Sequence, residues 1–275
     1  MKKFLLSWFV ASMVLGFTGE SVAATLYVDV NAANPVTPFT SWATAATNIQ
    51  SAVDAAVDGD TVSVTNGHYL LSSEILVTNN ITIQSVNGSG STVVDGGGVT
   101  RCFNLTDRDC LISGLTITNG HSADDGGGGG IYCSGISPVV SNCIITGNIA
   151  AGTYSIGGGM VQGTANNCTI SGNSAKYGGG MCGYPSGCIA NNCMISGNSA
   201  IAGGGVHSGT LNNCIITGNS AQDGDGGGMA YGTANNCTIS GNASIARGGG
   251  TYVTTATNCI VWYNEGSGEQ KNMLN

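Results

Sequence analysis

One sequence pattern recurs six times between Gly126 and Asn264: a run of glycines, a short variable stretch, and then Asn-Cys-x-Ile-x-Gly-Asn or a close variant. Repeats with a period of about 20 to 30 residues are stacked supersecondary units, and differences in their length are taken up in loops. The chain is therefore predicted to be a solenoid. The cysteines of the six copies are Cys143, Cys168, Cys193, Cys214, Cys237 and Cys259.

Each copy contains a short predicted strand whose two faces carry different residues. Successive side chains of a strand point to opposite sides, so the cysteine and the isoleucine two positions later share one face. Both residue types are often fully buried, so this face is predicted to point inward. The outward face then carries two rows of small or apolar side chains, which are Ile144, Thr169, Met194, Ile215, Thr238 and Ile260, and Thr146, Ser171, Ser196, Thr217, Ser240 and Trp262.

The glycines decide between a helical and a β solenoid. Glycine inside a helix costs about 1 kcal/mol relative to alanine, so units that open on Gly-Gly-Gly are poor helix pairs. Turns favour glycine and asparagine, which tolerate a positive φ. A coil of about 22 residues at ~3.3 Å per residue has a perimeter of roughly 70 Å, enough for three short strands and three corners. The predicted fold is an all-β, single-stranded parallel β-helix.

The repeat resembles the right-handed parallel β-helices of the pectin-lyase-like superfamily, and above all the repeats of chlamydial polymorphic outer membrane proteins. Those repeats pair Gly-Gly-Ala-Ile with Phe-x-x-Asn. Gly158-Gly159-Met160 is similar to the first motif, and Ile170-Ser171-Gly172-Asn173 is similar to the second with isoleucine in place of phenylalanine. These departures and the added cysteine indicate a related repeat rather than a member of that family. The resemblance covers most of residues 60 to 264 and implies a fold that serves lyases, hydrolases, adhesins and autotransporter passengers alike.

The first 24 residues are predicted to be a secretory signal peptide. Lys2 and Lys3 precede an apolar run from Phe4 to Phe17, and Val22-Ala23-Ala24 supplies small residues for cleavage. An uncleaved membrane anchor is the alternative, although the run is short for a bilayer span. We therefore expect a protein that is secreted or on the outer cell surface, without a membrane-spanning segment in the mature chain. The net charge of −8 argues against a nucleic-acid partner.

The rest of the chain divides into three predicted parts. Residues 25–60 form an N-terminal cap, with a strand and a short helix whose apolar stripe includes Ile49 and Val53. Residues 61–264 form the β-helix, and residues 265–275 are a polar tail. Because this tail resembles no cap, the last coil is expected either to be closed by its own aromatic residues, to associate end to end with another chain, or to continue in a longer surface protein.

The eleven cysteines allow three interpretations. Secretion permits disulfides. The column of six, however, is better suited to a ladder of buried thiols, because neighbouring coils hold equivalent Cβ atoms pointing the same way. A metal site is disfavoured, since no histidine or paired-cysteine spacing accompanies the column. Cys182 and Cys188 flank a turn sequence, Gly-Tyr-Pro-Ser-Gly, and are equally compatible with a disulfide and with free thiols.

The repeated asparagine that closes each copy has a structural explanation. Asparagine tolerates the left-handed conformation of a corner, and its amide can bond to the equivalent amide of the next coil. A ladder of amides, or else a set of plain solvated turns, is therefore expected. The members of this column are Asn148, Asn173, Asn198, Asn219, Asn242 and Asn264.

Only the acidic loops suggest chemistry. Asp124 with Asp125, and Asp223 with Asp225, are weak candidate Ca²⁺ ligands, and solvated acidic loops are the favoured explanation of them. The resemblance implies enzymes with clustered acids and a basic residue, yet the Asn-Thr-Asp, Gly-His-Gly and Arg-Ile-Lys motifs of polygalacturonases are missing. The basic residues after the signal peptide stand apart from the repeat columns. They are Arg101, Arg108, Lys176, Arg247 and Lys271.

The sequence thus favours a non-enzymatic role without assigning catalytic or binding residues. His68 and His207 are isolated and are expected to be structural or solvent-facing. The favoured function is a structural, adhesive or glycan- or protein-binding module, with a polysaccharide or another surface protein as partner and no cofactor other than the candidate Ca²⁺. The alternative is a polysaccharide lyase or glycoside hydrolase with an atypical acidic site. An ice- or crystal-binding face is disfavoured because the outward rows are mixed.

Overall fold

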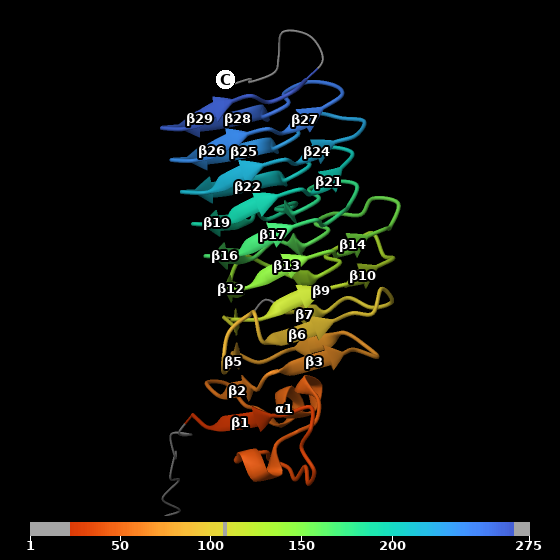
Figure 1. Ribbon diagram of the computed structural model, residues 1–275, viewed down its shortest axis with the longest axis vertical. Helices are drawn as coiled ribbons and strands as arrows, with labels where there is room; N and C mark the ends of the chain where they lie inside the picture. Colours follow the sequence, from red (N-terminus) through yellow and green to blue (C-terminus); the bar gives the residue numbers. More distant parts are fainter. Residues whose placement is uncertain (1–22, 107–108, 267–275) are drawn as a thin grey trace, which may run out of the picture.

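The computed structural model describes residues 23–106 and 109–266, and they form a parallel β-helix. The strand pairs of the described residues are parallel, and each strand pairs with its equivalents in the neighbouring coils, as in β13, β17 and β20. Figure 1 shows the coils stacked along one long axis, with the N-terminal cap at one end. The all-β solenoid predicted from the glycine-rich repeat is confirmed.

Three walls of strands run along the solenoid. The first wall is the long sheet, which has two rows of strands. The rows merge at β22 (Val206–Asn212), and the sheet continues through β25 (Met229–Asn235) and β28 (Thr251–Thr257). Its first row is β1 (Thr25–Val28), β2 (Thr61–Val64), β5 (Thr82–Ser85), β8 (Leu111–Ser113), β12 (Val139–Ser141), β16 (Thr164–Asn166) and β19 (Ile189–Asn191). Its second row is β4 (Ile75–Val77), β7 (Phe103–Leu105), β11 (Ile131–Cys133), β15 (Met160–Val161) and β18 (Met181–Cys182).

The second wall is the sheet built from the repeated Cys-x-Ile segments, and the third consists of short strands. The second wall comprises β3 (Gly67–Leu70), β6 (Thr92–Asp95), β9 (Thr116–Thr118), β13 (Ile144–Thr146), β17 (Thr169–Ser171), β20 (Met194–Ser196), β23 (Ile215–Thr217), β26 (Thr238–Ser240) and β29 (Ile260–Trp262). The third comprises β10 (His121–Ser122), β14 (Ile149–Ala150), β21 (Ser199–Ala200), β24 (Ser220–Ala221) and β27 (Ala243–Ser244).

The repeated cysteines and isoleucines line the interior. Cys168 and Ile170 are buried, while Thr169 between them is partly exposed. The cysteine, however, precedes strand β17 instead of lying in it, because the residue before it, Asn167, has φ of +52° and turns the chain. The cysteine column therefore lies at a corner, and the isoleucine column lies on the strands.

The cysteine column is a ladder of thiols that takes part in the backbone hydrogen bonding. The N–H of Cys168 donates to Sγ of Cys193 in the next coil at 3.4 Å, and Sγ of Cys168 donates to the carbonyl of Asn166 at 3.2 Å. Each sulfur thereby fills space at a corner and satisfies a buried N–H, which an aliphatic side chain of similar size could not do.

The asparagine column forms the second ladder. Nδ2 of Asn198 donates to Oδ1 of Asn219 at 2.9 Å, and Oδ1 of Asn198 accepts from Nδ2 of Asn173 at 3.0 Å. The expectation that these asparagines are left-handed was wrong. The left-handed residue is the preceding glycine, such as Gly172 at φ +63° or Gly197 at φ +62°. The asparagine can therefore keep ordinary backbone angles and aim its amide along the column.

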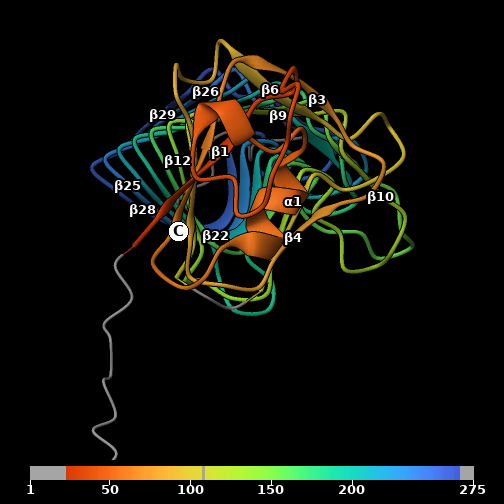
Figure 2. The same ribbon diagram turned by 90° about the horizontal axis from the view of Figure 1, so that it is seen from below.

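The N-terminal segment lies across the first coil. The 3₁₀ helix η1 (Trp42–Thr44) leads to helix α1 (Ile49–Ala55), whose first turn is capped by a hydrogen bond from the N–H of Ser51 to Oδ1 of Asn48. Ile49, Ala52 and Val53 are buried. Figure 2 shows α1 over the end of the solenoid. The apolar face of the helix covers core side chains of the first coil that have no coil beneath them.

At the other end, β28 and β29 form the last coil. Trp262 and Tyr263 contact each other there, with ring centroids 5.2 Å apart, and both are exposed. The predicted polar tail begins at Glu265, which pairs with Ala243 of the coil before it, but its residues from 267 onward lie outside the described part of the chain. Residues 1–22 of the predicted signal peptide lie outside it as well. Within the described residues, no helix is long and apolar enough to cross a bilayer.

Candidate ligand-binding groove

A groove lined by aromatic side chains lies on the outside of the second row of the long sheet. It consists of two adjoining hollows, which share Tyr154, Ile156 and Tyr184. The loop that precedes the glycine run at Gly157 supplies Tyr154 and Ile156, and the loop after β18 supplies Tyr184. The variable parts of the repeat therefore build this groove on top of the invariant stack.

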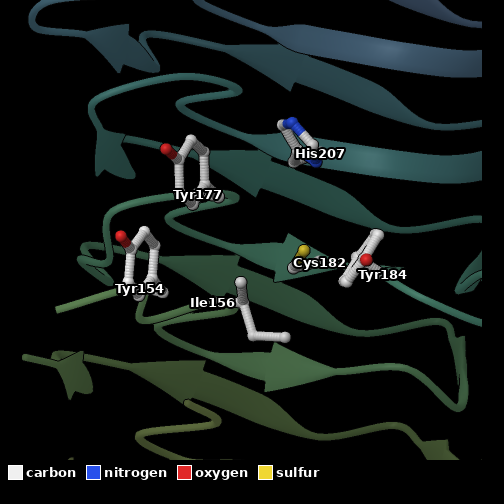
Figure 3. A pocket seen from close by; sticks show the side chains of 6 residues that line it. All are labelled: Tyr154, Ile156, Tyr177, Cys182, Tyr184 and His207. Atoms are coloured by element: carbon white, nitrogen blue, oxygen red, sulfur yellow. The ribbon is translucent and has the colours of Figure 1, made fainter. Parts of the chain in front are cut away.

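The first hollow has a volume of about 350 Å³ and an almost wholly apolar lining. In Figure 3, Tyr154 and Tyr177 lie one above the other, and Cys182, Tyr184 and His207 lie across from them. Cys182 and His207 are register partners on the adjacent strands β18 and β22. Burial raises the pKa of the Cys182 thiol to about 11 and lowers the pKa of His207. A protonated thiol and a neutral imidazole therefore line the hollow at neutral pH.

The second hollow has a volume of about 280 Å³ and carries more polar groups. Its walls include the rings of Tyr132, Tyr154 and Tyr184, and its polar side chains are Asp125 and Gln162. The carboxylate of Asp125 accepts a hydrogen bond from the N–H of Tyr154 at 2.8 Å, which ties two neighbouring loops together. This hollow combines aromatic faces with hydrogen-bond acceptors.

The aromatic lining continues toward the C-terminal coils. The ring centroids of Tyr177 and His207 are 5.5 Å apart, those of His207 and Tyr231 are 5.3 Å apart, and those of Tyr231 and Tyr252 are 5.7 Å apart. Each step moves up by one coil, so the aromatic row runs parallel to the solenoid axis. The rings are tilted or edge-to-face, which is the favoured geometry for aromatic pairs.

Three basic residues stack on the tyrosines of this groove. The guanidinium of Arg101 lies 5.2 Å from the ring centre of Tyr132, and that of Arg247 lies 4.5 Å from Tyr252. Nζ of Lys176 lies 5.3 Å from the ring centre of Tyr154. These are all the basic residues from 23 to 266 that the structure describes. The sequence placed them apart from the repeat columns, but the fold brings them to one face.

Two of the four acidic candidates, Asp124 and Asp225, pair with the two arginines. Arg101 is buried and contacts Oε2 of Glu74 at 2.8 Å and Oδ2 of Asp124 at 3.0 Å. Arg247 contacts Oδ2 of Asp225 at 2.7 Å. Burial by itself would raise the pKa of Asp124, but a hydrogen bond from Ser122 and the charge of Arg101 outweigh it and lower that pKa. The positive charge at the rim of the groove is therefore largely compensated.

No candidate Ca²⁺ ligands converge in the described part of the chain. Asp124 and Asp125 belong to one loop, but the first points to Arg101 and the second to the backbone of Tyr154. Asp223 and Asp225 belong to another loop, and Asp225 accepts from the N–H of Arg247 as well as from its side chain. Between residues 23 and 266, no group of three or more His, Cys, Asp or Glu side chains is arranged to hold a metal ion.

A separate polar region lies on the neighbouring wall. Nε2 of His68 lies 2.7 Å from Oδ2 of Asp95, and Nδ2 of Asn119 donates to Oδ1 of Asp95 at 3.1 Å. A hollow of about 320 Å³ is lined by Asp95, Asn119 and His121, and His121 also borders a smaller one beside Arg101. His68, which is isolated in the sequence and was expected to be structural or solvent-facing, is exposed and pairs with Asp95.

All eleven cysteines are free thiols. The sequence left a disulfide and free thiols open for Cys182 and Cys188. In the structure both residues are buried free thiols. Cys182 lines the groove, whereas Cys188 packs in the hydrophobic core. Every member of the repeated column is buried except Cys259 in the last coil, which is partly exposed.

We expect the native protein to react slowly with a thiol reagent at every cysteine except Cys259. Burial keeps the reagent from these thiols, and it raises the pKa of Cys102 to about 12 and that of Cys110 to about 11, which reduces the reactive thiolate. At Cys143, where a hydrogen bond with Cys168 lowers the pKa, burial alone limits the reaction. Mass spectrometry after alkylation should show at most one fast site in the native protein and eleven in denaturant without reductant. Fewer than eleven modified sites in denaturant would contradict the all-thiol state.

Comparison with known proteins extends the fold assignment. No protein-family model matches the chain, and no curated protein matches its sequence. The crystal structure of pectate lyase Pel9A superimposes with a TM-score of 0.55 and 12% sequence identity, over 91% of this chain and 80% of that one. The crystal structure of Escherichia coli YbhC matches with a TM-score of 0.47 and 13% identity, over 98% of this chain and 84% of that one. The first likeness shows the fold alone: the chain is a right-handed parallel β-helix of the pectin-lyase-like type.

Proposed function

We propose that this chain is a secreted or cell-surface β-helix protein that binds an extended polysaccharide along the aromatic groove. The observation that carries the proposal is the row of rings from Tyr177 through His207 and Tyr231 to Tyr252, in which each step is one coil. Sugar rings present apolar C–H faces that pack on aromatic side chains, while their hydroxyls point sideways to polar groups. An elongated groove with ring after ring matches a linear ligand better than a compact one.

The charge pattern favours a neutral glycan. Arg101 and Arg247 each bind carboxylates of the protein itself, so neither is available to hold an anionic ligand without leaving its partner. Lys176, whose Nζ donates to the carbonyl of Thr153 at 2.7 Å, is the remaining described base at the rim. The strongly negative net charge of the chain also disfavours long-range attraction of polyanions.

Tyr177→Ala tests this proposal, because Tyr177 contributes to the first hollow and to the aromatic row. Truncating an aromatic anchor at the centre of a binding site costs more than about 1 kcal/mol, so affinity should fall roughly tenfold. Binding would be measured by calorimetry against β-linked gluco-, xylo-, manno- and galacto-oligosaccharides. Tyr263→Ala is the matched control, because Tyr263 is exposed and lies outside the groove. Equal losses in both variants would contradict the proposal.

An enzymatic role is the second candidate, and the polar region around Asp95 and His121 favours it. Hydrogen bonds from the N–H of Gly97 and from Asn119 and His68 outweigh the effect of burial and lower the pKa of Asp95, so its carboxylate is ionised at neutral pH. Asp95 and His121 border the same hollow, which places two candidate acid–base groups together, although the lowered pKa makes Asp95 a weaker base than an ordinary carboxylate. Reducing-sugar release and the ultraviolet absorbance of unsaturated products, with Asp95→Asn and His121→Ala as variants, would detect this activity. Turnover that both variants abolish would favour the enzyme over the binding module.

A further inference from the structure

One buried amide in the groove has an unused acceptor. Gln162 is 5% exposed and borders the second hollow. Its Nε2 donates to the carbonyl of Tyr184 at 3.3 Å, while its Oε1 has no hydrogen-bond partner. Among the residues that the structure describes, this is the one buried side-chain nitrogen or oxygen left without a partner. An unpaired buried acceptor typically costs about 1 to 3 kcal/mol, so its presence requires an explanation.

The backbone at this position does not require glutamine. Gln162 has φ of +55°. The residues at the same bend in later coils have similar values, which are +58° for Ser208, +56° for Tyr231 and +48° for Val253. Those residues differ in size and polarity, so the bend itself accepts many side chains.

The surroundings of Gln162 select the kind of group that could pair with it. Besides the tyrosine hydroxyls, the second hollow is lined by two polar side chains, Asp125 and Gln162, whose carboxylate and carbonyl groups are acceptors. Its remaining walls include the rings of Tyr132, Tyr154 and Tyr184. A ligand that donates hydrogen bonds from the edge of a ring with apolar faces is complementary to this combination.

We propose that Gln162 is a specificity-determining residue of the groove, whose Oε1 accepts a hydrogen bond from a hydroxyl of a neutral sugar residue held between the tyrosines of the second hollow. This inference rests on the proposed function and adds a polar contact to it. The terminal torsion of glutamine is broad, so the carbonyl can be redirected toward the hollow without moving the backbone, in exchange for the 3.3 Å hydrogen bond from Nε2 to the carbonyl of Tyr184. A ligand hydroxyl then satisfies an acceptor that has no partner in the free protein.

Gln162→Met tests the inference, because methionine keeps the length and removes both polar atoms. Binding to the same four classes of oligosaccharide should weaken about tenfold or more, since a site built to bind a hydroxyl loses that contact. The melting temperature of the ligand-free protein should stay unchanged or rise, because the variant removes an unsatisfied buried group. Gln222→Met is the matched control on an exposed glutamine outside the groove, and it should leave binding unchanged.

Singly deoxygenated versions of the oligosaccharide that binds best provide the second measurement. Removing the hydroxyl that pairs with Oε1 should weaken binding to the native protein about tenfold and leave binding to Gln162→Met unchanged. A variant that binds like the native protein overturns the inference while Tyr177→Ala still tests the proposed function. A variant that loses binding together with melting temperature shows a structural role and overturns it as well. If the native protein binds none of the oligosaccharides, the proposed function fails and the inference falls with it.

Discussion

Replacing Asn198 by leucine is expected to lower the free energy of unfolding by about 4 kcal/mol. Asn198 is 1% exposed and takes part in four side-chain hydrogen bonds. Its Oδ1 accepts from the N–H and from Nδ2 of Asn173, and its Nδ2 donates to the carbonyl of Ile170 and to Oδ1 of Asn219. Leucine leaves the N–H of Asn173 and the carbonyl of Ile170 without these partners, in a place that water does not reach.

The same substitution at Asn191 is the control. Nδ2 of Asn191 donates to Oδ1 of Asn166, and its own Oδ1 accepts from Nδ2 of Asn212, both at 2.8 Å. This outer ladder is partly exposed, so water can replace the lost bonds and the expected loss is below about 1 kcal/mol. Urea unfolding followed by circular dichroism would measure both variants. Equal losses would show that burial of the inner ladder does not set its contribution.

The two ladders also show how far the sequence determines the fold. The period of the repeat, the inward isoleucines and the amide ladder follow from residue types, because each copy places the same side chain in the same surroundings. The details of the corners do not follow. In one copy of the repeat, Asn167 and Gly172 are both left-handed, whereas Asn173 is not. Asparagine tolerates both left-handed and ordinary backbone conformations. The residue type alone therefore does not show which asparagine of a coil turns the chain.

The groove could not be predicted from the fixed columns. Tyr154 and Tyr177 lie in the variable stretches before the glycine runs, and Tyr184 lies in a longer loop of one coil. Their convergence depends on how far each loop bends back over the sheet, which the repeat pattern does not fix. A weak signal was present, because six of the nine tyrosines occur close to the glycine runs of the repeats and contribute to the groove. They are Tyr132, Tyr154, Tyr177, Tyr184, Tyr231 and Tyr252.

The charged residues were misjudged for the same reason. Arg101 and Asp124 are 23 residues apart in sequence, which places them on adjacent coils, yet no periodic column contains either one. Long-range pairs outside the repeat are visible only when the coil lengths are known residue by residue. Asp124, a candidate metal ligand in the sequence, is the partner of the buried Arg101 in the structure. The aromatic groove is therefore the main candidate site on this face.

The glycine runs are needed for close approach of neighbouring coils, and Gly204→Ala should therefore lower the free energy of unfolding by about 3 kcal/mol or more. A Cβ at Gly204 would lie 2.5 Å from the carbonyl oxygen of Gly227 and 2.5 Å from the carbonyl group of Ser220. These are backbone atoms of the next coil, held in place by the parallel ladder, so they cannot move aside as a flexible side chain could. The added methyl group is expected to push two coils apart where the groove wall begins.

Gly172→Ala separates this steric requirement from conformational strain. Gly172 is left-handed, with φ of +63°, but a Cβ there would meet nothing closer than Oγ1 of Thr146 at 3.8 Å. The expected loss is about 1 to 2 kcal/mol, the cost of placing an L-residue in the left-handed region. Urea unfolding of both variants would compare the two glycines directly. A larger loss at Gly172 than at Gly204 would mean that backbone conformation, and not the contact between coils, makes the glycine columns necessary.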